Sequence, residues 1–278
     1  NMKNKVILVD GSSVGYRAFF AAMFQYKSSW ESAKETSEEV FKDIQDIVVK
    51  ETMMIFGGYI NTIYKRERLT GKDSDTKMFI AWDFQSGSKT FRGELYPPYK
   101  GNRKKRDIPV NLFPSLRNVG DEVADDSWNI EGYEADDIIG SAVEKYKSKD
   151  TTILIVSSDK DFFQLVDDKN NIRVQSPIKG ASVYKTYKEA DVFKEFGVSP
   201  EKIVDYKALV GDSSDNFPGV RLIGPKIATE LLNTYNSIDE VYSNLDNIKP
   251  GLVKKLEAGK SDAYLFQKIA QIVKDIEL

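Results

Sequence analysis

The stretch KVILVDGSS, at residues 5–13, decides the fold. Its apolar part is short and rich in β-branched residues, which is typical of a strand buried on both faces. Asp10 ends the strand, and the Gly and Ser residues that follow are typical of a helix start, with the hydroxyl of Ser12 or Ser13 as N-cap. A buried strand that leads directly into a helix predicts a parallel α/β sheet.

Two further stretches repeat this pattern. KMFIAW at residues 77–82 is followed by Asp83, and TTILIV at residues 151–156 is followed by two serines and Asp159. Between the first stretch and residues 77–82, residues 38–69 show helical periodicity, as one long helix or two short ones around a Gly-Gly pair. Strands that alternate with helices predict an α/β fold with a mostly parallel central sheet and helices on both faces.

The remaining sequence divides into two regions. Residues 1–198 should form the α/β core, with a long, Pro-interrupted and irregular segment at about 90–127 that carries a basic run. Residues 199–278 read as helices separated by Gly and Pro. An amphipathic C-terminal helix, at about 262–276, could belong to the core or to a docking surface.

The composition excludes several kinds of chemistry. The 278 residues include no Cys and no His, so there is no disulfide, thiolate, sulfur-bound zinc or serine–histidine triad. A catalytic metal would need oxygen ligands, which favours Mg²⁺, with Mn²⁺ as a substitute. The sequence shows no run of 18 apolar residues and no signal-peptide pattern, so we expect a cytoplasmic protein (host cytoplasm if phage-encoded) without membrane contact.

Acidic residues stand after the expected strands and at the start of expected helices. Taken singly, each has a structural explanation, because acids complement the helix dipole and aspartates stabilise turns. The strand-end aspartates, however, should meet at one sheet edge, where open α/β sheets bind ligands. The nine acids are Asp10, Asp83, Glu134, Asp136, Asp137, Asp159, Asp161, Asp212 and Asp215.

Gathered at one edge, these carboxylates would repel one another strongly. Two like charges about 4 Å apart repel by about 4 kcal/mol at an effective dielectric constant of about 20. Cations among them would relieve this repulsion. A pair of divalent ions about 3.5–4 Å apart can activate water and stabilise the leaving oxygen in phosphodiester hydrolysis. Metal-dependent phosphate chemistry therefore suits a sequence without histidine.

Six motifs, in this order, resemble those of the 5′-nuclease (flap endonuclease) family, in particular its stand-alone phage members of the T-even ribonuclease H type. The resemblance covers about residues 5–235, and six ordered motifs are far more specific than any one. It implies a PIN/5′-nuclease-like core. The motifs are VDGSS at 9–13, YKGNR at 99–103, YEADD at 133–137, SSDKDF at 157–162, GDSSDN at 211–216 and GVRLIGPK at 219–226.

The resemblance also implies roles for individual residues. Asp10, Asp83, Glu134, Asp136, Asp137 and Asp159 would surround a first Mg²⁺, and Asp161, Asp212 and Asp215 a second. Among these, Asp136 and Asp159 are also taken as catalytic. Lys100 and Arg103 would contact the scissile phosphate and stabilise developing charge, Arg17 would contact a phosphate, and a terminal base would stack on Tyr99. The segment 90–127 would be an arch for a single-stranded 5′ end, with Lys104, Lys105 and Arg106 among its basic residues.

The last motif resembles a helix–hairpin–helix. In the family, hairpin amides hold a duplex phosphate and carbonyls can hold K⁺. Here these contacts would fall on Gly219, Val220, Gly224 and Lys226. Leu222 stands where the usual pattern has a second glycine, which puts the tight hairpin and the K⁺ site in question. The alternative is an ordinary corner between two helices.

The resulting hypothesis is a two-metal 5′ nuclease with 5′→3′ exonuclease activity on duplex DNA and RNA·DNA, for primer removal, and endonuclease activity at 5′ flaps. A monomer that meets replication proteins is expected. One alternative is a non-catalytic structure-specific DNA-binding protein, which the nine acids argue against. Another is a small-molecule phosphatase, in which the basic segment and hairpin would have no purpose.

The net charge of −3 does not contradict nucleic-acid binding. Without the nine acids, 40 Lys and Arg stand against 34 acidic residues, and bound metals would neutralise the site itself. A few phosphate contacts should then carry the binding, so we expect moderate affinity with strong salt dependence.

Overall fold

The computed structural model describes residues 4–70, 75–84, 90–104 and 107–278. They form one six-stranded sheet with the order β3-β2-β1-β4-β5-β6, parallel except for β6. The predicted α/β class with a mostly parallel sheet is confirmed. The strands are β1 (Asn4–Asp10), β2 (Asp75–Ala81), β3 (Asp126–Trp128), β4 (Thr151–Val156), β5 (Ile172–Lys179) and β6 (Val183–Tyr187).

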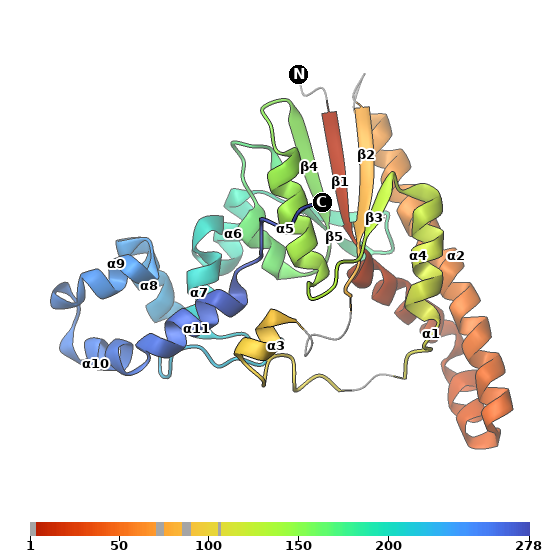
Figure 1. Ribbon diagram of the computed structural model, residues 1–278, viewed down its shortest axis with the longest axis horizontal. Coiled ribbons are helices and arrows are strands. Elements are labelled where there is room, and N and C mark those ends of the chain that lie inside the picture. Colours follow the sequence, from red (N-terminus) through yellow and green to blue (C-terminus); the bar gives the residue numbers. More distant parts are fainter. Residues whose placement is uncertain (1–3, 71–74, 85–89, 105–106) are drawn as a thin grey trace.

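Helices cover both faces of the sheet, as predicted. In Figure 1, α1 and α2 lie side by side and extend past the sheet, whereas the C-terminal helices gather on the opposite side. The helices of the core are α1 (Gly11–Thr36), α2 (Glu38–Thr70), α3 (Phe91–Leu95), α4 (Leu112–Val123), α5 (Ala135–Tyr146), the 3₁₀ turn η2 (Lys160–Leu165) and α6 (Glu189–Phe196). The C-terminal region holds η3 (Pro200–Lys202), α7 (Ile203–Val210), α8 (Pro225–Tyr235), α9 (Ile238–Ser243), η4 (Leu245–Asn247), α10 (Pro250–Ala258) and α11 (Lys260–Ala270).

Each face of the sheet has its own hydrophobic core. On one face, Trp82 packs against Phe56 of α2 at 5.6 Å between ring centroids, and both side chains are buried. On the other face, α5 and the C-terminal helices enclose Phe162 and Phe217, which are also buried. Each fully buried aliphatic or aromatic side chain contributes about 1.5–3 kcal/mol, so these cores fix the strand ends that carry the acids.

The helix after β1 begins earlier than expected. Asp10 itself is the N-cap of α1, and its Oδ1 accepts a hydrogen bond from the Ser13 amide at 3.1 Å, so the expected serine cap is wrong. The carboxylate that ends the strand is the first acceptor that these amides reach. Gly11 is needed because a Cβ there would lie 2.7 Å from Trp82.

The structure settles one open alternative and changes two other sequence expectations. Residues 38–70 form one uninterrupted helix, α2, because tertiary packing outweighs the low helix propensity of two glycines. The segment 90–127 is not irregular throughout, since it contains α3 and α4, and α4 buries Leu112 and Leu116. The last helix, α11, ends at Ala270 rather than near residue 276.

The C-terminal helices form a compact unit that touches the core. The predicted helical character after residue 199 is confirmed, and α11 packs against α7 with Phe266 buried against Phe217. The last residues, 271–278, run in extended form along α5, and this closeness requires Gly140. Within the described residues, the helices are all too short or too polar to cross a bilayer.

Candidate active site

The carboxyl ends of β1, β2 and β4 meet at one edge of the sheet, as the sequence predicted (Figure 1). Asp10 is the last residue of β1 and is buried, Asp83 follows β2, and Asp159 follows β4. Their charges influence one another: the carboxylates of Asp83 and Asp159 both raise the pKa of Asp10. The parallel register of the strands therefore brings together acids that lie far apart in the sequence.

Asp10 and Asp83 also hold their neighbours in place. Ser157 Oγ donates a hydrogen bond to Asp10 Oδ2 at 2.7 Å and accepts one from the Asp159 amide at 3.0 Å. Asp83 Oδ1 accepts the amide of Ala135 at 2.8 Å, at the start of α5. Burial, followed by the charges of Asp83 and Asp159, raises the pKa of Asp10 to about 7. Without a cation, this site therefore favours protonated carboxyl groups.

The motif YEADD forms the first acid cluster at the start of α5. Carboxylate oxygens of Glu134, Asp136 and Asp137 lie within 4.8 Å of one another. Among the described residues, Asp136 Oδ1 is a buried oxygen with no hydrogen-bond partner. Burial, followed by the charges of Asp137 and Glu134, raises the pKa of Asp136 well above its usual value. A buried acceptor without a donor, surrounded by like charges, fits a cation.

Arg92 of α3 crosses this cluster and is 2% exposed. Its Nη1 and Nη2 donate to both oxygens of Asp137 at 2.7 and 2.8 Å, and Nη1 also donates to Glu134 Oε2 at 2.9 Å. The carbonyls of Ile269 and Gln271 accept its remaining N–H groups at 2.8 Å each. Arg92 thereby links α3, α5 and the C-terminal segment, and it occupies the oxygens of Asp137.

The second acid cluster joins η2 to the loop after α7. Carboxylate oxygens of Asp161, Asp212 and Asp215 lie within 4.8 Å of one another. The Lys207 ammonium contacts Asp161, and it donates to Asp212 Oδ2 at 2.9 Å. Burial opposes ionisation of Asp212, but the charge and hydrogen bond of Lys207, together with hydrogen bonds from Ser214, lower its pKa to about 2. This cluster therefore contains its own cation.

The motif YKGNR lies across both clusters. The Lys100 ammonium contacts Glu134, and the Lys100 amide donates to the Asp215 carbonyl at 2.9 Å. Arg103 Nη2 donates to Asp215 Oδ1 at 3.1 Å. Burial opposes ionisation of Glu134, but the charges of Lys100 and Arg92 outweigh it and lower its pKa. The basic pair expected at the scissile phosphate thus lies directly beside the acids.

Tyr99 lies in a different environment from the one expected. Its ring is 3% exposed, and its hydroxyl donates to Glu134 Oε2 at 2.9 Å. Burial and the Glu134 charge raise the pKa of this hydroxyl. A base could not stack on this ring, because it is buried within the core on this face of the sheet. Tyr99 instead holds the Glu134 carboxylate in place through this hydrogen bond.

The other nucleic-acid candidates of the core are Arg17, Lys104, Lys105 and Arg106. Arg17 is one turn into α1 and donates to the Ile178 and Gly180 carbonyls of the β5–β6 turn, the latter at 3.3 Å. Lys104 is exposed. Lys105 and Arg106 lie outside the described residues.

The hairpin between α7 and α8 keeps a tight geometry despite Leu222. Leu222 has a positive φ of 66°, is 67% exposed, and so takes the conformation that a glycine would adopt there. Gly219 has φ 68°, and a Cβ would lie 2.4 Å from the Gly211 amide. Val220 is buried, and its amide donates to the Leu209 carbonyl at 2.9 Å. Gly224 precedes α8 as its N-cap, and Lys226 in its first turn is exposed.

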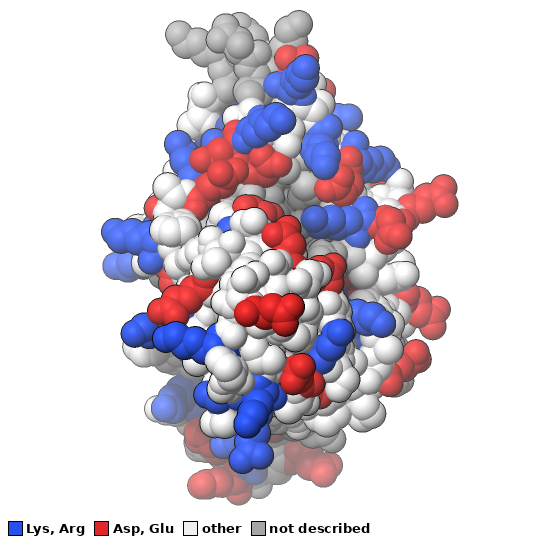
Figure 2. Space-filling view, turned by 90° about the vertical axis from the view of Figure 1, so that its left-hand side faces the viewer, with Lys and Arg blue, Asp and Glu red and all other residues white. Residues whose placement is uncertain are grey.

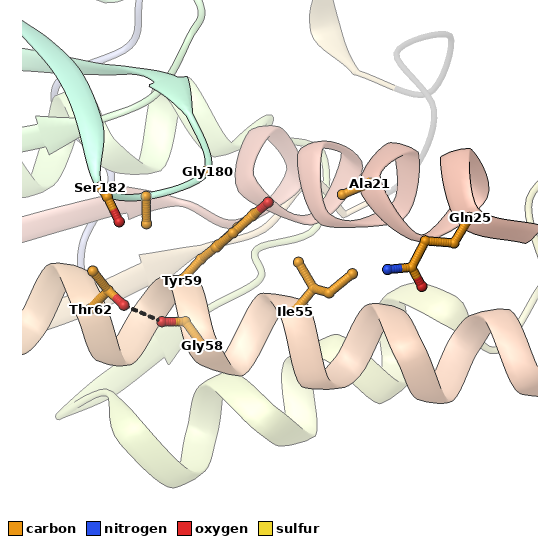
Figure 3. A pocket seen from close by; sticks show the side chains of 9 residues that line it. Ala21, Gln25, Ile55, Gly58, Tyr59, Thr62, Gly180 and Ser182 are labelled. Atoms are coloured by element: carbon orange, nitrogen blue, oxygen red, sulfur yellow. Dashed lines mark hydrogen bonds between the residues drawn. The ribbon is translucent and has the colours of Figure 1, made fainter.

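Two surfaces away from the sheet edge contrast with the site. Figure 2 shows the face on the side of the C-terminal helices, where basic and acidic side chains are interspersed among uncharged ones. An open groove of about 440 Å³ between α1, α2 and the β5–β6 turn is lined by uncharged residues, among them Gln25, Tyr59 and Ser182 (Figure 3). Neither surface is known to bring carboxylate clusters and basic side chains into direct contact, as the sheet edge does.

Three residues at the site were missed by the sequence reasoning. Lys207 could have been found, because it is a single cation in the otherwise mostly apolar run IVDYKALV, next to buried Ala208. Ser157 lies in the motif at residues 157–162, but no pattern indicated its contact with Asp10, and Arg92 carries no sequence signal. Their roles depend on contacts between segments that are distant in the sequence, and Arg92 alone joins three of them.

Comparison with known proteins shows which family this chain resembles over its whole length. Residues 5–197 match the N-terminal resolvase-like domain of 5′-3′ exonucleases, and residues 198–278 match the C-terminal SAM fold of 5′-3′ exonucleases. The chain is 32% identical to the 5′-3′ exonuclease of Bacillus subtilis, covering 97% of this chain and 83% of that protein.

Longer proteins and solved structures also match. DNA polymerase I of Caldicellulosiruptor bescii is 36% identical over 99% of this chain, which spans only 29% of that polymerase. A crystal structure of the bacteriophage T5 flap endonuclease, in a complex with DNA and metal ions, has a TM-score of 0.68 at 18% identity, covering 97% of this chain and 89% of that one. At this identity, the structural match shows a shared fold.

Proposed function

Because the chain belongs to the 5′-3′ exonuclease family, whose members hydrolyse phosphodiester bonds in nucleic acids, we propose that it is a Mg²⁺-dependent, structure-specific 5′ nuclease. The observation that carries this proposal is the buried Asp136 oxygen without a partner, inside a cluster of carboxylates and beside Lys100. Such a site attracts a divalent ion and presents a cationic side chain next to it.

The residues present would hold two ions. Asp10, Asp83, Glu134, Asp136 and Asp159 would hold one, and Asp161, Asp212 and Asp215 the other. Bound there, the ions would supply positive charge for the attacking and leaving oxygens of the phosphodiester. Asp137, which the family resemblance also placed among the ligands, gives both oxygens to Arg92, so we assign it to holding α5 in position.

The chain's own cations would act on the phosphate. Lys100 and Arg103 are each paired with a carboxylate of one cluster, Glu134 and Asp215. When those carboxylates turn to a metal ion, both cations become available to phosphate oxygens. They would then stabilise the negative charge that develops in the transition state, where fixed positive charge has its largest effect.

We propose 5′ ends in duplexes as the substrate class, at nicks, in RNA·DNA hybrids and at 5′ flaps. The hairpin between α7 and α8 supports duplex binding, since Gly219 and Leu222 take the left-handed conformation of a tight turn and Lys226 is exposed just after it. The segment 96–104 lies over the acids from α3 onwards, where a single strand could pass. A K⁺ ion at the hairpin and a monomeric state stay predictions.

The test is cleavage of 3′-labelled substrates, a 5′-flap duplex and a nicked RNA·DNA hybrid, with Mg²⁺ and with EDTA. Asp136→Asn removes one metal ligand at constant shape, and Asp246→Asn changes an exposed acid far from the sheet edge as its matched control. We expect Mg²⁺-dependent cutting near the junction, lost in Asp136→Asn and kept in Asp246→Asn.

Two other outcomes would point elsewhere. Tight binding without cutting under any divalent ion would support a non-catalytic DNA-binding protein. Hydrolysis of nucleotide monophosphates without cleavage of oligonucleotides would support a phosphatase. Cleavage of the RNA·DNA hybrid but not of the flap, or the reverse, would set the preference within the proposed substrate class.

A further inference from the structure

The second acid cluster has a feature that its metal-binding role does not require. Lys207 of α7 is 8% exposed, and its ammonium lies between Asp161 and Asp212. Burying an ammonium group is unfavourable unless carboxylates compensate for the lost hydration. The two carboxylates provide that compensation, so ammonium and acids stabilise one another in the absence of any other ion.

Both carboxylate oxygens of Asp212 already accept hydrogen bonds in this arrangement. Its Oδ2 accepts the Lys207 ammonium at 2.9 Å. Its Oδ1 accepts the Ser214 amide at 2.8 Å, the Ser214 hydroxyl at 2.6 Å and the Asp215 amide at 3.3 Å. A divalent ion that binds Asp212 must therefore compete with the ammonium and with the donors of the turn.

The first cluster offers a contrast. There the buried Asp136 Oδ1 has no partner, although Lys100 and Arg92 neutralise the neighbouring Glu134. An incoming ion gains this acceptor without displacing a hydrogen bond. In both clusters a lysine pairs with a carboxylate, Lys100 with Glu134 in the first and Lys207 with Asp161 and Asp212 in the second. The clusters differ in that Asp136 keeps a buried oxygen without a partner, whereas both oxygens of Asp212 accept hydrogen bonds.

We propose that Lys207 is a resident cation of the second cluster that weakens divalent-ion binding there, so that the two clusters fill one after the other as metal concentration rises. This inference rests on the proposed metal-dependent function. Its physical basis is repulsion between an ammonium and a divalent ion that share ligands, which is strong at separations of a few ångströms in a partly buried site. Lys207 is therefore a residue that tunes metal occupancy.

The experiment measures Mn²⁺ binding without nucleic acid, by electron paramagnetic resonance of the free ion and by calorimetry. The first cluster is disabled with Asp136→Asn so that the second is titrated alone. In this background Lys207→Met removes the charge while keeping most of the length of the side chain. Lys207→Arg keeps the charge. We expect Lys207→Met to tighten Mn²⁺ binding by about tenfold or more and Lys207→Arg to leave it close to the parent value. Unchanged or weaker binding in Lys207→Met would overturn the proposal.

Folding is checked in parallel by thermal unfolding in EDTA and in Mn²⁺, with Lys207→Gln as a second neutral variant. We expect both neutral variants to have a lower Tm in EDTA and to gain more from Mn²⁺ than the parent, because the metal takes the place of the ammonium. If the neutral variants stay unfolded in Mn²⁺, Lys207 has a purely structural role and the proposal is wrong. Since no nucleic acid is present, the result is independent of whether the protein cleaves flaps.

Discussion

Arg92 and Asp137 form a two-pronged ion pair inside the protein, with hydrogen bonds of 2.7 and 2.8 Å and with both side chains almost completely buried. A guanidinium matches a carboxylate in this geometry, whereas a lysine ammonium cannot donate in the same parallel arrangement. The pair fixes the start of α5, where Glu134 and Asp136 must be presented to a cation. Its integrity should therefore matter for both stability and metal binding.

Arg92→Gln should lower the free energy of unfolding by about 3–5 kcal/mol, because it leaves Asp137 buried and without its partner. Arg92→Lys should recover only part of this loss. Urea unfolding in EDTA measures both. Arg173→Gln, which breaks a half-exposed pair with Asp168, is the matched control and should cost about 1 kcal/mol or less. A loss as small as that of the control would show that the buried pair contributes little.

Lys100→Ala should slow the chemical step far more than it weakens substrate binding. Removing one group that stabilises transition-state charge typically lowers the rate about 10²–10³-fold. Single-turnover cleavage at saturating enzyme measures the step, and a binding titration in Ca²⁺ measures affinity. Lys149→Ala, an exposed residue beyond the opposite end of β4, serves as control. Unchanged single-turnover rates in Lys100→Ala would remove this lysine from the reaction.

The metal-free protein should lose stability as the pH rises. Burial and the charges of Asp83 and Asp159 raise the pKa of Asp10 from 3.8 to about 7, so the folded state holds a proton that the unfolded state has lost. Stability from this group is fully present below the unfolded pKa and is lost as the pH rises through the folded one. The effect is at most about 4 kcal/mol.

Unfolding in EDTA at pH 5, 6, 7 and 8 tests this expectation. Asp10→Asn keeps an acceptor for the Ser13 amide and should flatten the pH profile, whereas Asp246→Asn should not change it. Equal slopes in Asp10→Asn and the parent would show that another group carries the pH dependence.

Leu222→Gly should stabilise the protein by about 0.5–1 kcal/mol. A left-handed conformation costs a non-glycine residue about 1–2 kcal/mol, and the greater freedom of glycine in the unfolded chain offsets part of the gain. Leu222 loses little packing because it is 67% exposed. Arg221→Gly, at an exposed position outside the positive-φ set, should change stability in the opposite direction. Urea unfolding compares the two, and destabilisation by Leu222→Gly would mean that the leucine makes contacts worth more than the strain.

The sequence carried the fold class and the location of the acids because both depend on local rules. Apolar runs such as that before Asp10 predict buried strands, and parallel strands must bring their carboxyl ends to one edge. The exact ends of helices did not follow from these rules. The N-cap of α1 was misplaced by two or three residues because Asp10 reaches the Ser13 amide. The end of α11 was overestimated because residues 271–278 are held in extended form by α5.

By itself, the sequence determined which chemistry is available: carboxylates without histidine or cysteine, a basic motif at residues 99–103 and a hairpin motif in which a leucine replaces a glycine. Only the tertiary structure decided how each charge is compensated. It paired Arg92 with Asp137, placed Lys207 between two aspartates, enclosed Tyr99 against Glu134 and left an oxygen of Asp136 without a partner. The reason is physical, because the energy of a buried charge depends on atoms within a few ångströms, and those atoms come from distant parts of the chain.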